Sequence, residues 1–192
     1  MSPITRPVLV LSAVVFGLFC QPVSAQEGTS QPVARLITSV SPASIGVPLV
    51  TAGAAPTLAQ ANEIEKRAFE QTNVIRVQKG LPPLKWDAEV CLMARSHSES
   101  MSRLGFFSHT TPQGQRLRDR ARAAGIAQFS VLGENIAYNQ GYEDPGAFAV
   151  ERWMLSPKHR DNILSSEFRA MAIGSFVAAD GSVYLTQTFI TR

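Results

Sequence analysis

The chain has little cysteine, histidine or charge, and each shortage removes a class of fold or site. Of its 192 residues, two are cysteine (Cys20 and Cys91) and three are histidine. If Cys20 leaves with an export signal, Cys91 has no internal disulfide partner, so the fold must be stabilised by its core. Charged residues make up 17% of the chain and hydrophobic residues 45%, a composition that argues against disorder of the whole chain.

The familiar catalytic motifs are also absent. The sequence contains no HExxH, GxSxG, CxxC pair, P-loop or GxGxxG. The formal net charge of +3 is too small to indicate a nucleic-acid partner. The one basic run, Arg116 to Arg122, is interrupted by Asp119, which is typical of a solvated helix face rather than of a phosphate-binding patch.

No hydrophobic run reaches the ~20 residues that a membrane-spanning helix needs. The run from Val8 to Phe19 follows Arg6 and has the length of a signal-peptide core, and Val23-Ser24-Ala25 offers a cleavage site. We therefore predict a signal peptide over residues 1–25, with an uncleaved anchor as the alternative. Cys20 follows Phe19 rather than a small residue, which argues against a lipid anchor, so no stable membrane anchor is expected after cleavage.

The rest of the chain divides into a linker and one domain. Residues 26–56 are rich in Pro, Ser and Ala and predict a disordered linker, and residues 57–192 predict the folded domain. Apolar periodicity predicts helices near residues 57–79, 87–104, 115–124, 145–155 and 158–164. Alternating residues 168–178 and 182–191 around Asp180-Gly181 predict a β-hairpin, and residues 136–139 a short strand. The fold class is therefore α+β.

Histidine and acidic residues are the candidates for chemistry. His109 and His159 fall in predicted turns, where functional groups concentrate, whereas His97 lies within a helix and is expected to be structural. Glu134, within Gly133-Glu134-Asn135, is either a carboxylate that hydrogen-bonds nearby backbone or a catalytic acid. The residues alone leave these alternatives open.

Short segments that occur in a fixed order along the chain give further information. The segments are Asn73-Val74-Ile75-Arg76, Gly80 to Trp86, Ala94 with His97 and Met101, Phe107-Ser108-His109, Gly114, Arg120, Ala124-Gly125, Gly133 to Ala137, Trp153 with Ser156, His159-Arg160, and Thr186-Gln187 with Phe189. Together they resemble the bacterial branch of the CAP superfamily, also called SCP-like domains. The resemblance covers about 130 residues, and its most specific parts are the Glu134 segment and the two flanking histidines.

The resemblance implies a three-layer α-β-α sandwich with a small antiparallel sheet and a cleft lined by two histidines and two acidic residues. Carried onto this sequence, the histidines match His109 and His159, and one acid matches Glu134. The only candidate for the second acid is Asp119, which is read either as part of the cleft or as a helix-surface charge. Trp86 and Trp153 are predicted to be buried.

Two neutral imidazoles, His109 and His159, could hold Zn²⁺ weakly, with water in the other positions. Glu134 would then act through water or orient a histidine. The alternative is a hydrogen-bonded polar cluster that braces the cleft and binds no metal.

Three functions are weighed. The first is an exported, monomeric module, secreted or periplasmic, that binds a lipid or protein ligand. The second is a metal-dependent hydrolase acting on peptide or cell-wall material, with Glu134 as base. The third is a lipid or sterol carrier. The absence of a visible set of nucleophile, base and orienting group favours a binding module over an enzyme.

Overall fold

The computed structural model describes residues 57–192, so the predicted signal peptide and linker lie outside the described residues. The order of elements follows the sequence-based prediction closely. The elements are η1 (Leu58–Gln60), α1 (Glu63–Gln78), β1 (Lys85–Trp86), α2 (Ala88–Arg103), α3 (Leu117–Ala123), β2 (Val131–Gln140), α4 (Pro145–Leu155), α5 (Pro157–Leu164), β3 (Ala170–Val177) and β4 (Ser182–Thr191).

The sheet has four strands in the order β1-β3-β4-β2. The predicted hairpin is confirmed, since β3 and β4 pair antiparallel from Ala170↔Ile190 to Val177↔Val183. β2 also pairs antiparallel with β4, and it is longer than the strand predicted over residues 136–139. The expected small antiparallel sheet is present in β2, β3 and β4, and the departure from it is β1, which pairs parallel to β3 through two residues. The chain reaches β3 from β1 through the helices, so a parallel pair is allowed there.

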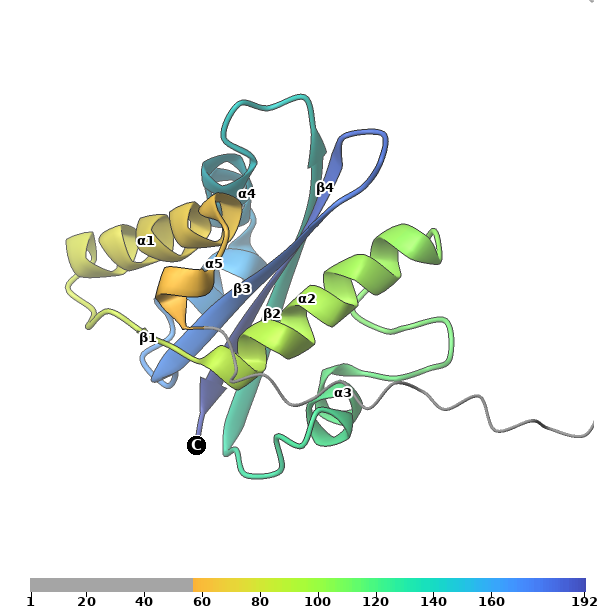
Figure 1. Cartoon of the computed structure of the whole chain (residues 1–192). Helices are drawn as coiled ribbons and strands as arrows, with labels where there is room; N and C mark the ends of the chain where they lie inside the picture. The colour runs from red at the N-terminus through yellow and green to blue at the C-terminus, as the bar shows by residue number, and fades with distance from the viewer. Residues whose placement is uncertain (1–56) are drawn as a thin grey trace, which may run out of the picture. The chain divides into compact units, whose positions relative to one another are not determined.

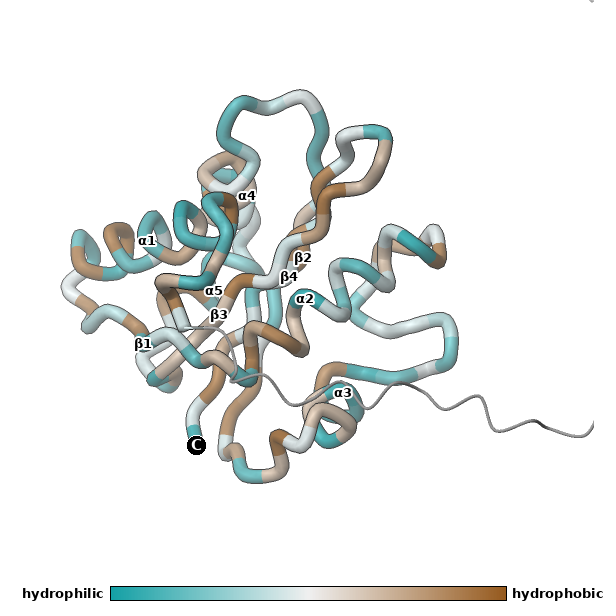
Figure 2. The backbone as a smooth tube through the Cα atoms, in the orientation of Figure 1, coloured by the Kyte–Doolittle hydropathy of each residue, from teal (hydrophilic) through white to brown (hydrophobic). Residues whose placement is uncertain are grey.

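Helices cover both faces of the sheet, which confirms the three-layer α-β-α arrangement. Helices α1, α4 and α5 lie on one side, and α2 and α3 lie on the other (Figure 1). Hydrophobic residues concentrate on β3 and β4 at the centre, whereas the loop after α2 is mostly hydrophilic (Figure 2). This loop carries His109, so one predicted site residue lies at the surface of the sandwich.

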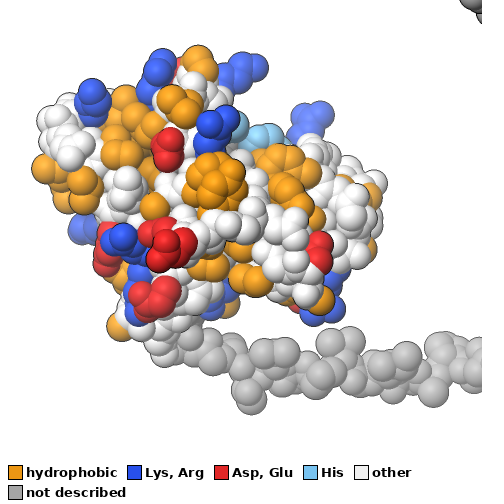
Figure 3. Space-filling model, turned by 90° about the horizontal axis from the view of Figure 1, so that it is seen from above, with side chains coloured by type: hydrophobic (Ala, Val, Ile, Leu, Met, Phe, Trp, Pro, Cys, Tyr) orange, Lys and Arg blue, Asp and Glu red, His pale blue; other side chains and the backbone are white. Residues whose placement is uncertain are grey.

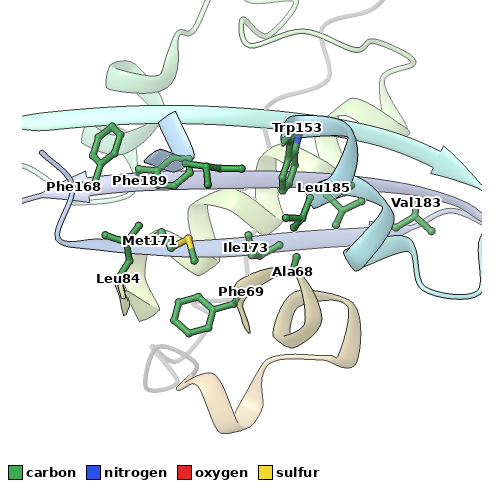
Figure 4. Close-up of a cluster of buried hydrophobic side chains, with 13 residues drawn as sticks. Ala68, Phe69, Leu84, Trp153, Phe168, Met171, Ile173, Val183, Leu185 and Phe189 are labelled. Carbon is green, nitrogen blue, oxygen red and sulfur yellow. The ribbon is translucent and has the colours of Figure 1, made fainter. Parts of the chain in front are cut away.

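The larger core fills the space between the sheet and the layer of α1, α4 and α5. Trp153, Leu185 and Phe189 are at most 1% exposed and pack with Ala68 and Ile173 (Figure 4). The indole N–H of Trp153 donates to the Ile136 carbonyl oxygen at 2.9 Å, which satisfies the polar atom of a buried ring.

The prediction for the second tryptophan holds only in part. Trp86 is half-buried because it lies on β1, a two-residue strand at the edge of the sheet, where its ring meets Phe69 edge-on with centroids 5.2 Å apart.

The first predicted helix is two elements rather than one. Asn62 interrupts it: the backbone there is extended and the side chain accepts a hydrogen bond from the Glu65 N–H at 3.0 Å, which caps α1. Asparagine at this position favours a helix start over helix continuation. Further along α1, Asn73 exchanges hydrogen bonds with the backbone of Leu84, and Arg76 donates to the carbonyls of Pro82, Ile163 and Ser165. Both residues therefore tie α1 to neighbouring segments.

Helix α2 lies unusually close to β3. A Cβ atom placed on Gly174 would lie 2.0 Å from the Arg95 backbone nitrogen and 2.2 Å from the Ala94 carbonyl carbon. Ser98 Oγ donates to the Gly174 carbonyl oxygen at 2.8 Å. The thiol of Cys91 also faces β3 and donates to the Ile173 carbonyl oxygen at 3.5 Å. Burial raises the pKa of this thiol to about 12, so Cys91 is a structural residue. This contact between helix and strand therefore depends on small side chains.

Candidate functional site

The site is organised by two adjacent residues on β2, Glu134 and Asn135. Successive side chains of a strand point to opposite faces of a sheet. Glu134 points towards α3 and bonds His109, whereas Asn135 points towards α5, where its amide donates to the His159 carbonyl oxygen at 3.1 Å. The two predicted histidines are thus held on either side of one edge strand.

Glu134 is bound on both of its oxygens. The Nδ1–H of His109 donates to Oε1 at 2.9 Å, and Arg120 Nη2 donates to Oε2. Arg120 also donates from Nη1 to the His109 carbonyl oxygen at 2.7 Å, which fixes the loop that carries the histidine. Because Nδ1 carries the proton that is donated to Glu134, the lone pair of the neutral His109 ring lies on Nε2. The side chain of His109 is 52% exposed, so this nitrogen can meet a ligand.

The electrostatics keep Glu134 ionised. Burial alone raises the pKa of a carboxyl group, and the side chain of Glu134 is only 4% exposed. The hydrogen bond from His109 and the charge and hydrogen bond of Arg120 outweigh burial, and the pKa of Glu134 falls below its ordinary value. The carboxylate is therefore a fixed anion that orients His109, rather than a group that exchanges protons near neutral pH.

Arg120 corrects the reading of the basic run Arg116–Arg122 as a solvated face. Its neighbours Arg118 and Arg122 are exposed, but Arg120 is buried with 8% exposure. A signal was present in the sequence, because Arg120 lies three residues after Leu117 and next to Ala121, on the side of the helix that faces the core. The alternating charges of the run made this core-facing side of the helix hard to recognise from the sequence.

Asp119 is not brought to the cluster. It is exposed, and its carboxylate accepts a hydrogen bond from the Arg116 N–H at 2.9 Å at the start of α3. In the described part of the chain it has no hydrogen bond or ion pair with His109, Glu134 or His159. Its position matches the reading as a helix-surface charge, and the charged side chain that pairs with Glu134 from α3 is Arg120.

His159 lies at one end of an open groove of about 750 Å³ that runs beside β2. Burial, and then the proximity of a second imidazole, that of His109, lower the pKa of His159, so its ring is neutral at neutral pH. Histidine surface is visible beside hydrophobic and cationic side chains on the upper face of the molecule (Figure 3). Within residues 57–192, no group of three or more His, Cys, Asp or Glu side chains is placed to hold a metal ion. A metal site here would therefore use two histidines and water.

Glycine is required next to the site for a steric reason. A Cβ atom on Gly133 would lie 2.6 Å from Phe168 Cζ and 3.2 Å from Asn162 Oδ1. Asn162 needs this space, because its amide donates to the Glu134 carbonyl oxygen at 3.2 Å and to Asn135 Oδ1 at 2.9 Å. In the Gly133-Glu134-Asn135 segment, the glycine thus leaves space for Asn162, the glutamate supplies the anion that bonds His109, and the amide of Asn135 binds α5.

His97 is structural, as expected from its place within a helix. It is 1% exposed, and its Nε2–H donates to the Ser108 carbonyl oxygen at 3.1 Å, next to His109. Burial, then the charge of Arg120, lower the pKa of His97 to about 4. The ring therefore stays neutral where a free histidine would take up a proton.

This difference predicts a pH dependence of stability. Between pH 6.5 and about 4, unfolded His97 binds a proton that the folded protein does not accept, so the free energy of unfolding falls as the pH falls. The loss is expected to reach up to about 3 kcal/mol across that window. Urea unfolding of the wild type and of His97→Gln, which keeps a donor for Ser108, measures the effect. Equal slopes against pH in the two proteins would contradict the assignment.

The sandwich, with two histidines and a glutamate around one edge strand, has the arrangement that the resemblance to CAP domains implied. The comparison with known families agrees: the model of the CAP family, described as the cysteine-rich secretory protein family, matches residues 69–189, and this chain belongs to that family. In the described residues, no helix is both long and apolar enough to cross a membrane.

Relatives in Bacillus show the same similarity. The chain is 41% identical to YlbC of Bacillus subtilis, named an uncharacterized membrane protein, over 67% of this chain and 34% of that one. It is 32% identical to the uncharacterized protein YkwD of Bacillus subtilis, over 88% of this chain and 62% of that one. The crystal structure of an extracellular SCP-domain protein from Bacillus anthracis matches with a TM-score of 0.60 and 32% identity, over 70% and 43% of the two chains. The chain thus spans less than two thirds of the length of each.

Proposed function

We propose that this CAP domain is a binding module that works outside the cytoplasm, secreted or periplasmic, with a ligand site around His109 and His159. The observation that carries the proposal is the fixed chain from Arg120 through Glu134 to His109, beside a groove lined by His159. It presents an oriented and exposed imidazole next to a neutral one. The description of the Bacillus anthracis neighbour as extracellular, together with the predicted signal peptide, supports the location.

The same donor set fits a weakly held Zn²⁺. Nδ1 of His109 is occupied by Glu134, which leaves Nε2 as a ligand, and the lowered pKa of His159 keeps that ring available. If bound, zinc would supply a positive charge that attracts an anionic group of a ligand. With two protein ligands, the ion should exchange readily.

The metal proposal predicts a specific result in calorimetry. Zn²⁺ is expected to bind the full chain, and both His109→Ala and His159→Ala should abolish the heat of binding. Because His159 is not buried, the free energy of unfolding should change by less than about 0.5 kcal/mol in His159→Ala. His109→Ala should cost about 1–2 kcal/mol, because it removes a hydrogen bond from the buried carboxylate of Glu134.

Two controls define the limits of that test. Lys158→Ala, an exposed change beside His159, should leave zinc binding unchanged. Glu134→Gln should weaken it by about 10–100-fold, as loss of a group that orients a metal ligand does. Strong destabilisation by either histidine substitution, without any metal effect, would favour the metal-free cluster that only braces the cleft.

The contacts argue against hydrolysis by a serine or cysteine nucleophile. A serine hydrolase needs a hydroxyl within hydrogen-bond reach of its base. Ser108, the neighbour of His109, accepts a hydrogen bond from the Thr110 N–H through its own oxygen, so it faces its own turn. In the described residues no serine or cysteine side chain is hydrogen-bonded to either site histidine.

A further inference from the structure

Strand β2 forms a free edge of the sheet, since only β4 pairs with it. In an antiparallel strand, the N–H and C=O of one residue point to the same side, and the side alternates along the chain. The carbonyls of Glu134 and Ile136 point away from β4, because they accept hydrogen bonds from Asn162 and Trp153. With no break in register up to Gln140, the backbone groups of Tyr138 point outward as well.

These outward groups have no partner in the described part of the chain. No hydrogen bond joins the N–H or C=O of Tyr138 to residues 57–192, whereas side chains of α5 and α4 donate to the outward carbonyls of Glu134 and Ile136. Proteins usually protect a free edge with charge, proline or a covering segment. Here the open part of the edge lies in the groove, which is lined by the whole segment from Ile136 to Gln140.

The groove has an apolar wall on each side of that edge. Phe107 and Tyr138 lie on the side of α2, with ring centroids 6.5 Å apart, and Phe148 and Ala149 of α4 lie on the other side. Successive side chains of an extended segment also point to opposite sides. A strand laid along Ile136–Gln140 would therefore place one set of side chains against each wall.

The charge of the side chains that line the groove indicates the charge of its ligand. Arg152 lines the groove, while no Asp or Glu does. No ion pair joins Arg152 to an acidic side chain of the described residues, so its guanidinium is available to a ligand. This arrangement complements a carboxylate.

We infer that the groove binds an extended peptide segment that adds a strand to the free edge of β2 and carries an acidic residue towards Arg152. The inference rests on the proposed binding function and names its ligand class. Main-chain hydrogen bonds to Tyr138 would supply affinity, and the two apolar walls and Arg152 would supply specificity.

The test begins with random linear peptides displayed on phage and selected on the full chain. Selected peptides are synthesised, and their affinity is measured by calorimetry. Tyr138→Pro removes the outward N–H without removing a bond to β4, and it should weaken binding about tenfold or more, whereas Tyr138→Ala, which keeps the N–H, should weaken it less. Arg152→Ala should weaken acidic peptides, and Arg160→Ala, exposed and outside the groove, should not.

A second measurement does not depend on protein variants folding. The selected peptide is N-methylated at one position at a time, and binding is expected to fall at every second position, because an added strand bonds its neighbour through alternate residues. No enrichment of peptides, or a loss with no period of two, would overturn the inference. A dimer of the chain that Tyr138→Pro dissociates would also overturn it, since a second copy would then occupy the edge.

This test separates the two proposals. Peptide binding with the period of two in a protein that shows no heat with Zn²⁺ would refute the metal site and leave the strand-addition inference intact. Zinc binding in a protein that selects no peptide would support the metal site and refute the strand-addition inference.

Discussion

Replacing Arg120 with alanine is expected to lower the free energy of unfolding by about 3–5 kcal/mol, the range for breaking a buried ion pair from one side. The reason lies with the partner left behind. The side chain of Glu134 is 4% exposed, and without Arg120 its charge would be balanced only by the hydrogen bond from His109. The loop that carries His109 would also lose its bond to Arg120 Nη1. Equilibrium unfolding in urea measures the change.

Two companion variants make this result specific. Arg122→Ala, exposed on the same helix, should change the free energy of unfolding by less than about 0.5 kcal/mol. The double variant Arg120→Met with Glu134→Leu should recover most of the stability lost in Arg120→Ala, because an apolar pair replaces a buried ionic one. A loss below about 1 kcal/mol in Arg120→Ala would show that water reaches Glu134 and that the pair is not a structural unit.

Gly174→Ala is expected to destabilise the domain by at least about 3 kcal/mol, at or above the upper range for overpacking. The new Cβ atom would lie 2.0 Å from the backbone nitrogen of Arg95, so α2 must move away from β3. That movement would stretch the bond from Ser98 to Gly174 and expose the small residues between the layers. Thermal unfolding followed by circular dichroism measures the loss.

A second glycine provides the matched control. Gly141 has a φ of +78°, and a Cβ atom there would meet nothing within 4 Å. Gly141→Ala should therefore cost only about 1–2 kcal/mol of backbone strain. If both variants lose the same amount, the close approach of α2 to β3 does not determine stability.

The sequence allowed the helices and the hairpin to be predicted because their signals are local. Apolar periodicity, Pro145 and Pro157 at helix starts, and Asp180-Gly181 between alternating segments each act over a few residues. The parallel pairing of β1 was missed because its partner is far along the chain and the strand has only two residues. A strand that short leaves no periodic signal.

For the site, residue types and the family pattern were enough to predict which residues take part, but not which contacts they make. His109, Glu134 and His159 were named from the sequence, but their connections depend on which face of β2 each neighbour occupies. Arg120 was interpreted as part of a solvated helix face, but it is buried and is the counter-ion of Glu134. Asp119, three residues after Arg116, serves its own helix terminus instead. Long-range pairing of charges is not encoded in local spacing.

The buried thiol described above has a chemical consequence for the folded domain. A thiolate, not a thiol, reacts with oxidants and disulfides. Cys91 is fully buried, and its pKa of about 12 keeps it protonated. Residues 57–192 contain no other cysteine, so folded copies present no reactive thiol to one another. The described domain therefore has no disulfide bond to gain or lose between oxidising and reducing surroundings.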